Sequence, residues 1–185
     1  TFSANAFTSE FLEMLHHDRD ILEQLNADWE KENDDPKFDK FRENLTHNFF
    51  DKGINPSGKL VLFSESVDTL NYLYDRLTKE MGRSDVLMVT ATNRNHLGQT
   101  IKENFDANFD SDSMKYNILI TSDVLAEGVN LHRANVIVNY DSPWNATRLM
   151  QRIGRVNRIG SVAPNIYNYM FYPSQQGDKE IQLYK

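Results

Sequence analysis

The sequence predicts an α/β fold in which a mostly parallel sheet carries helices on both faces, preceded by a helical extension at the N-terminus. Short apolar runs alternate with longer stretches of helical periodicity along residues 58–173. The runs are almost continuously apolar, as strands covered on both faces are. Repeated βα units of this kind form parallel sheets. The 185 residues, of which 39% are apolar and 25% charged, suit one globular domain.

The negative charge divides the chain after residue 57. The formal net charge is −7, and residues 1–57 carry 13 acidic against 6 basic side chains, whereas residues 58–185 carry 14 of each. Such an asymmetry marks a boundary. We therefore expect an acidic helical extension and linker helix over 1–57, an α/β domain over 58–173 and a tail over 174–185.

Two helices are expected in the extension. Apolar residues recur at helical spacing from Phe7 to Trp29, with acidic residues on the other face, which predicts one long helix. Pro36 suits the first turn of a second helix, Pro36–Phe50, and Gly53 followed by Asn55–Gly58 ends it in a loop.

The α/β region is expected to contain five strands separated by helices. The predicted strands are Leu60–Phe63, Val86–Val89, Ile118–Ile120, Val136–Val138 and Ile166–Phe171. One predicted helix carries apolar residues from Val67 to Met81, and two further helices are expected near Asn95–Phe109 and Asn145–Val156. Ligands of parallel sheets bind beyond the carboxyl ends of the strands, so the segments after Phe63, Val89, Ile120 and Tyr140 are where we expect functional residues.

Composition excludes several classes of protein. No apolar run approaches the roughly 20 residues that span a bilayer, so no membrane role is expected. The chain has no cysteine, which excludes disulfides, thiolate zinc sites and cysteine nucleophiles. The first thirty residues lack the pattern of a secretory signal. A cytoplasmic protein fits these observations. His16 and His17, followed by Asp18 and Asp20, do not converge on one helix face, so we expect no metal site.

The segment Gln151–Gly160, with the sequence QRIGRVNRIG, carries the strongest chemical signal. It spaces Arg152, Arg155 and Arg158 by three residues, within a stretch from Arg133 that holds five arginines and one acidic residue. Arginines at this spacing lie along one side of a helix and its exit, where they can meet phosphates. For an isolated Arg-x-x-Arg the better interpretation would be a solvated basic helix face.

Three segments resemble, in family order, motifs IV, V and VI of superfamily 2 helicases and translocases: Lys59–Ser64, Ile118–Leu131 and Gln151–Gly160. Asp141–Asn145 is also similar to the Asp-x-x-Trp-Asn segment that precedes motif VI in SNF-type remodellers and their bacterial relatives. The resemblance covers about Pro36–Tyr172. It implies the second, C-terminal RecA-like lobe of a two-lobed ATP-driven motor, nearest the SNF-type DNA translocase branch in bacteria.

The resemblance also implies roles for single residues. Arg155 and Arg158 would act as arginine fingers on ATP phosphates that the first lobe holds. Gly128, Asn130 and Gln151 match positions that approach the nucleotide. Gln151 stands where DEAD-box enzymes have a histidine.

Nucleic-acid contacts are expected at the strand ends. Ser122 follows a buried strand, so its hydroxyl and nearby amides suit a phosphate, and by resemblance it faces the nucleic-acid backbone. Ser64 and Thr90 end strands at the same edge and either contact phosphate or cap the following helices. Arg152 either contributes to the interface or forms a salt bridge or helix-surface contact.

Two first-lobe motifs are absent from the sequence. It contains no Gly-x-x-x-x-Gly-Lys-Ser/Thr segment and no Asp-Glu-x-His or Asp-Glu-Ala-Asp segment. We therefore expect ATP and Mg²⁺ to be held mainly by the first lobe, and this chain alone to be inactive. The expected partners are that lobe and double-stranded DNA, at the nucleoid of a bacterium, with RNA as the open alternative. The competing hypothesis is a non-catalytic RecA-like module that binds protein or nucleic acid, against which the intact arginines count.

Overall fold

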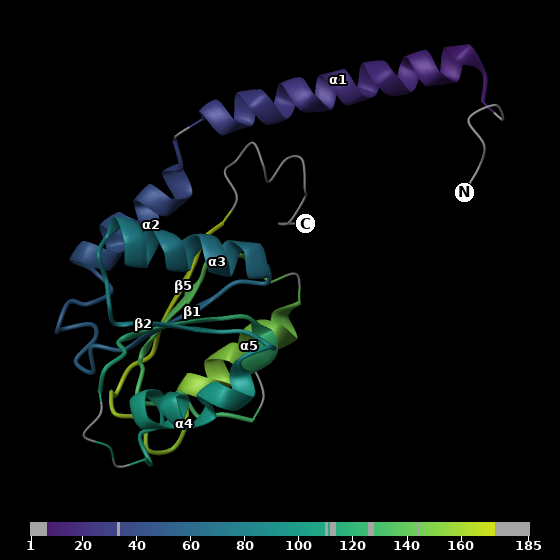
Figure 1. Cartoon of the computed structure of the whole chain (residues 1–185). Coiled ribbons are helices and arrows are strands. Elements are labelled where there is room, and N and C mark those ends of the chain that lie inside the picture. The colour runs from purple at the N-terminus through teal and green to yellow at the C-terminus, as the bar shows by residue number, and fades with distance from the viewer. Residues whose placement is uncertain are drawn as a thin grey trace. The chain divides into compact units, whose positions relative to one another are not determined.

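The computed structural model describes residues 7–32, 34–109, 111, 114–125, 128–143 and 145–172. These residues form five α-helices and five strands, whose arrangement can be followed in Figure 1. The helices are α1 (Ser9–Lys31), α2 (Pro36–His47), α3 (Val67–Asp75), α4 (Arg94–Phe105) and α5 (Ala146–Val156). The strands are β1 (Leu60–Phe63), β2 (Val86–Val89), β3 (Ile118–Thr121), β4 (Val136–Asn139) and β5 (Tyr167–Met170). A π-helical turn, η2 (Arg76–Glu80), continues α3, and a 3₁₀ turn, η3 (Asp123–Leu125), follows β3.

The strands form one sheet in the order β2-β3-β1-β4-β5, and every neighbouring pair is parallel. Val61 in the central strand lies opposite Leu119 on one side and Ile137 on the other. The predicted parallel α/β sheet is therefore confirmed, and all strand carboxyl ends meet at one edge.

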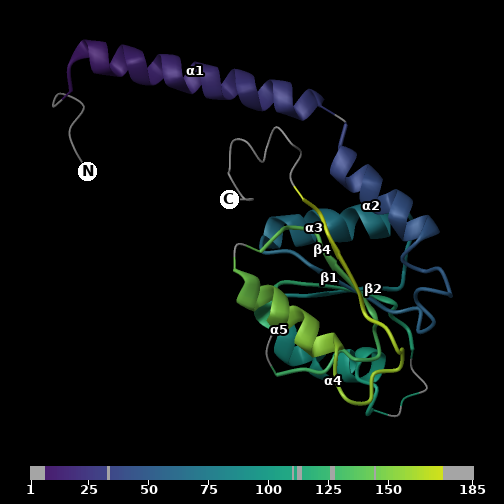
Figure 2. The same cartoon turned by 180° about the vertical axis from the view of Figure 1, so that it is seen from behind.

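Helices cover both faces of this sheet. Figures 1 and 2 show α3 on one face and α4 with α5 on the other. On the α4 and α5 side, Val61 and Phe63 of β1 share a buried cluster with Phe105 of α4 and Val156 of α5. Successive strand residues point to opposite faces, which is why the apolar runs are continuous.

The last strand departs from the prediction. We expected residues 166–171 to be buried on both faces, but β5 lies at the sheet edge and its residues are only partly buried. Tyr167, Asn168 and Tyr169 carry polar groups that can face solvent at the edge of the sheet. The predicted burial of this strand is therefore wrong, because position in the sheet is not visible in the strand itself.

The helical extension is confirmed with shifted ends. Thr8 caps α1 by accepting a hydrogen bond from the amide of Phe11 at 3.3 Å. The second helix ends at His47, and a turn follows instead of helix to Phe50. The ring of Phe49 packs against that of Tyr169 with centroids 4.7 Å apart, so the turn is fixed by contact with β5.

The chain divides into two compact units between Lys40 and Phe41. Phe41 is buried and its ring meets that of Tyr140 edge-on, with centroids 5.9 Å apart. The C-terminal part of α2 therefore belongs to the α/β unit. Among the described residues, no helix is both long and apolar enough to cross a membrane.

Candidate functional site

Ser64 and Thr90 end strands at the carboxyl edge, but both are buried. The Ser64 hydroxyl donates to the Asp141 carboxylate and accepts from the amide of Ser66. The Thr90 hydroxyl bonds that of Thr92 at 2.8 Å. Both hydroxyls are therefore engaged within the protein, and contact of either with a phosphate stays a prediction.

The alternative interpretation, that these two side chains cap helices, is not what the structure shows either. The N-cap of α3 is Ser66, whose hydroxyl accepts the Thr69 amide at 3.3 Å. The turn before α4 is closed by Asn93, which accepts the Thr90 amide at 2.8 Å.

Ser122 is the strand-end hydroxyl that stays partly exposed. It follows β3 directly and accepts a hydrogen bond from the amide of Val124 at 3.4 Å. This contact bends the chain into η3 and leaves the hydroxyl near the surface, able to donate to an oxygen of a ligand. Contact between Ser122 and a nucleic-acid phosphate stays a prediction.

Arg152 is fully buried, and its role is structural. Its Nε atom donates to Asp123 Oδ1 at 2.6 Å and its Nη1 atom to Asn139 Oδ1 at 3.0 Å. The guanidinium also lies 5.1 Å above the ring centre of Phe63. Of the two interpretations, the salt bridge is therefore the observed one, and it ties α5 to η3 and β4.

Arg94 of α4, a residue that the sequence motifs do not include, holds η3. Its Nη1 atom donates to the carbonyl of Val124 at 2.9 Å. Gly128 has a φ of +82°, and a Cβ atom there would lie 3.0 Å from Arg94 Nη2. A side chain at 128 would therefore be strained and crowded. The available signal was an arginine in the first turn of the helix after β2.

Asn130 and Arg158 are brought together at the far end of α5. Arg158 Nη1 donates to Asn130 Oδ1, and Arg158 Nε to the carbonyl of Gly154 at 3.3 Å. Arg158 is exposed, as is Gln151, whereas Arg155 is partly buried. The Arg155 carbonyl accepts the amide of Leu131 at 2.9 Å, which ties the helix to the end of the 128–131 segment.

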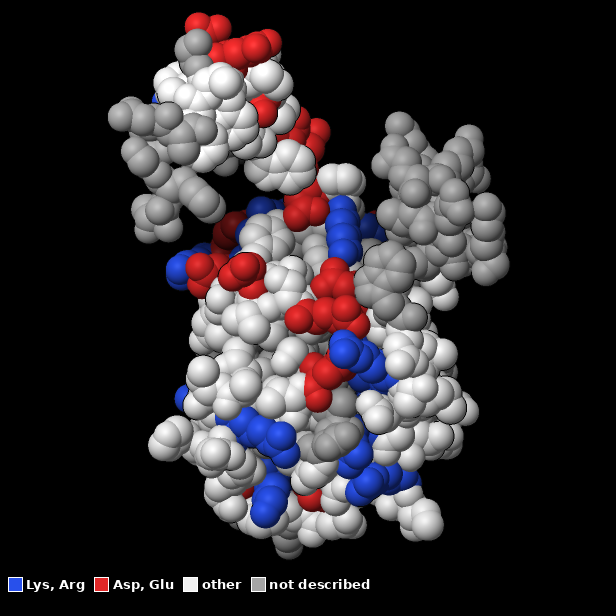
Figure 3. Space-filling model, turned by 90° about the vertical axis from the view of Figure 1, so that its right-hand side faces the viewer, with Lys and Arg blue, Asp and Glu red and all other residues white. Residues whose placement is uncertain are grey.

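Basic side chains gather on the α4 and α5 side of the domain. Figure 3 shows most blue groups on the lower half of the molecule, which in Figure 1 is the layer of α4 and α5, and a red band above them. A local basic surface attracts phosphate even on an acidic protein. Asp123 partly offsets this charge, since it pairs with both Arg148 and Arg152.

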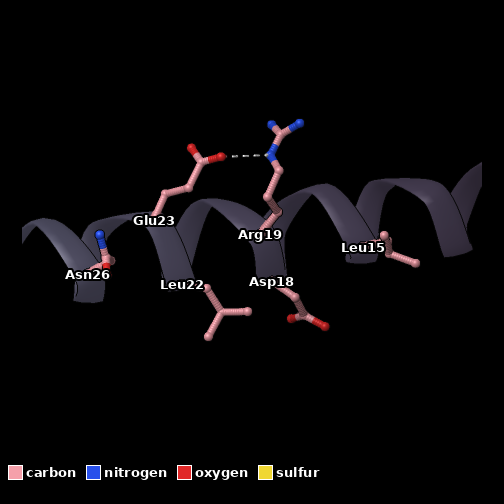
Figure 4. A pocket seen from close by; sticks show the side chains of 6 residues that line it. All are labelled: Leu15, Asp18, Arg19, Leu22, Glu23 and Asn26. Carbon is pink, nitrogen blue, oxygen red and sulfur yellow. Dashed lines mark ion pairs between the residues drawn. The ribbon is translucent and has the colours of Figure 1, made fainter. Parts of the chain in front are cut away.

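A shallow hollow lies along α1, where Leu15, Asp18 and Leu22 point to one side of the helix and the Arg19–Glu23 ion pair, at 3.7 Å, lies on the other (Figure 4). It is a helix surface without converging polar groups. Within the described residues, no group of three or more His, Asp or Glu side chains is placed to hold a metal ion.

Residues 22–160 match the family model described as helicase conserved C-terminal domain. An uncharacterized ATP-dependent helicase, YqhH of Bacillus subtilis, is 47% identical over 55 residues, which is 29% of this chain and 10% of that protein. The ATP-dependent RNA helicase DBP5 of Debaryomyces hansenii is 29% identical over 62% of this chain and 23% of its own length. The ATP-dependent DNA helicase mph1 of Neurospora crassa is 25% identical over 66% of this chain and 11% of its own.

Among solved structures, the C-terminal part of the Fun30 ATPase domain has a TM-score of 0.60 at 21% identity, over 80% of this chain and 45% of that one. This likeness shows a common fold. The chain therefore spans less than a quarter of the length of each of the three relatives.

Proposed function

The chain belongs to the family of helicase conserved C-terminal domains of superfamily 2, and from this we propose that it is the second lobe of a two-lobed motor that moves on double-stranded DNA. The observation that carries the proposal is the end of α5. There an exposed arginine, Arg158, follows the C-cap residue Asn157 and is anchored by Asn130, three residues after Arg155. An exposed guanidinium that is already held in place can bind phosphates that the first lobe holds.

Arg155 and Arg158 are the proposed arginine fingers. A guanidinium is planar, permanently charged and able to donate two parallel hydrogen bonds, so it stabilises charge on phosphate oxygens better than lysine does. ATP with Mg²⁺, when bound against the first lobe, supplies the transferable phosphoryl group. The two arginines would neutralise negative charge there, while Gly128, Asn130 and Gln151 line the approach.

Ser122 and the basic layer around α5 are the proposed grip on nucleic acid. A hydroxyl and exposed arginines bind phosphates without reading bases, so affinity should fall with salt and depend little on sequence. Double-stranded DNA is proposed because Asp141–Asn145 is similar to the segment of SNF-type motors. RNA is the alternative, since relatives include proteins named as RNA helicases.

The arginine fingers are tested by Arg158→Ala in the protein that carries both lobes. Removal of an arginine finger lowers the rate by about 10³ or more, so we expect ATP hydrolysis stimulated by nucleic acid to fall about a thousandfold. Arg42→Ala, which removes an exposed arginine of α2, should leave hydrolysis unchanged. Unaltered hydrolysis by Arg158→Ala would refute the assignment and favour the non-catalytic module.

A further inference from the structure

An acidic side chain outside the family motifs lies behind the Asn130–Arg158 pair. Asp106 is the residue that ends α4, where a longer helix to Phe109 was expected. Its Oδ2 atom accepts a hydrogen bond from Asn130 Nδ2 at 3.3 Å. Asn130 in turn presents its Oδ1 atom to Arg158 Nη1. A continuous chain of polar contacts therefore runs from the end of α4 to the proposed finger.

The carboxylate decides which way the Asn130 amide faces. A carboxylate only accepts hydrogen bonds, whereas an amide has one accepting and one donating end. Because Asp106 takes the NH₂ end of Asn130, the oxygen end is left for Arg158, which only donates. With the amide reversed, NH₂ would face guanidinium and the contact would be lost.

Asp106 is itself held in place from several directions. Its Oδ1 atom accepts the amide of Asn108 at 3.0 Å and lies 3.7 Å from Nδ1 of His132. His132 is buried, and neither of its ring nitrogens has a hydrogen-bond partner within the part of the chain that the structure describes. Arg133 clamps the backbone of the same turn, since its Nη2 atom donates to the carbonyls of Asp106 at 2.9 Å and Phe109 at 2.6 Å.

The segment after the finger closes over this turn. Gly160 has a φ of +91°, and a Cβ atom there would lie 3.6 Å from Asn108 Oδ1 and 3.7 Å from His132 Nε2. The hydroxyl of Ser161 accepts a hydrogen bond from the backbone amide of Arg158 at 3.1 Å. The end of α4 and the exit of α5 are therefore in direct contact.

We propose that Asp106 is a positioning residue for Arg158, acting through the amide of Asn130. The inference rests on the proposed function of Arg158 as an arginine finger. Asp106 touches neither phosphate nor nucleic acid in this role. It fixes the orientation of the amide that holds the guanidinium, and so reduces the freedom that the finger would lose on reaching a phosphate.

The first test uses this chain without nucleotide. We expect the side-chain NH₂ of Asn130 and the Nε proton of Arg158 to exchange with solvent at least several-fold faster in Asp106→Ala, as measured by NMR. The isosteric Asp106→Asn should show the same direction of change and serves if the alanine variant does not fold. Asp51→Ala is the matched control. Asp51 accepts the amide of Gly53, two residues later, at 2.8 Å, just as Asp106 accepts the amide of Asn108, but it lies in a different turn. Unchanged exchange at both groups would overturn the proposal.

The second test is a double-mutant cycle in the two-lobed protein. Asp106→Ala should lower kcat about tenfold with little change in KM for ATP, and should cause no further loss when Arg158 is already alanine. An equal loss in both backgrounds would show a merely structural role and overturn the proposal, as would no loss in either. If Arg158→Ala itself leaves hydrolysis intact, the proposed function fails, and the exchange measurement still decides whether Asp106 orients Asn130.

Discussion

Arg148 and Arg152 lie one turn apart on α5 and pair with the same carboxylate, that of Asp123. Their surroundings differ: the Arg148 side chain is 52% exposed, and that of Arg152 is 0% exposed. A buried ion pair that loses one partner leaves an uncompensated charge, whereas an exposed pair contributes little. The two arginines therefore allow a direct comparison of buried and exposed charge.

Arg152→Ala should lower the free energy of unfolding by about 3 kcal/mol, because it leaves the space of a fully buried side chain empty, takes a donor from buried Asn139 and leaves Asp123 with Arg148 alone. Arg148→Ala should change it by less than about 1 kcal/mol. Urea unfolding of both variants measures this. Equal effects of the two substitutions would contradict the structural role of Arg152.

Sequence reasoning placed Arg152, Arg155 and Arg158 along one side of a helix and its exit, but it could not tell which of them points inward. That depends on Asp123 and Asn139, which come from other elements. The same limit applies to Ser64, whose burial depends on Asp141 after β4. The arginine and serine motifs were recognisable along the chain, whereas the pairing partners lie 13 to 77 residues away.

At the scale of elements, the starts of β1, β2 and β3 are joined by a polar cluster opposite the predicted ligand edge. Lys59 precedes β1, and it is 1% exposed. Burial, followed by the positive charge of Arg133, lowers the pKa of Lys59, and against the opposing effect of Asp85 the pKa falls to about 8. Burial also raises the pKa of Asp85, but hydrogen bonds from Arg83 and Asn117 outweigh this and hold it below its usual value.

Because Lys59 is buried, the free energy of unfolding should vary with pH in the alkaline range. The folded state releases the Lys59 proton near pH 8, whereas the unfolded chain keeps it up to about 10.5, so the unfolded state binds more protons between these values. The free energy of unfolding should therefore gain a contribution that rises with pH in this window. Lys59→Met should abolish that contribution, and the exposed Lys79→Met should keep it, in urea unfolding at several pH values. The same pH profile for both variants would contradict the buried position.

Most elements were predictable because their patterns are local. The central strands are continuously apolar and buried on both faces, and the periodicity of α1 is regular over 23 residues. The position of β5 at the edge was not predictable, because strand order follows from packing. The sequence of α1 also does not tell which surface its apolar face packs on. The large apolar residues of this helix are exposed in the structure, with Trp29 at 81%.

At the scale of the whole molecule, α5 contacts both η3, which follows Ser122, and residues 128–131, which hold Arg158. Arg152, in the second half of α5, donates to Asn139 of β4, and the Arg155 carbonyl, in the last turn, accepts the amide of Leu131. A rigid α5 would therefore carry a displacement at one site to the other. Under the proposed function, such coupling would link the ATP phosphates at Arg158 to the nucleic acid at Ser122.

The most direct measurement is ATP hydrolysis by the two-lobed protein and by this 185-residue chain, each with duplex DNA, single-stranded DNA and RNA. We predict stimulation by duplex DNA in the two-lobed protein and no phosphate release by the chain alone. If RNA were the one nucleic acid that stimulates hydrolysis, RNA would take the place of double-stranded DNA as the proposed substrate. Appreciable hydrolysis by this chain alone, or none by the two-lobed protein with any nucleic acid, would contradict the assignment as the second lobe of a motor.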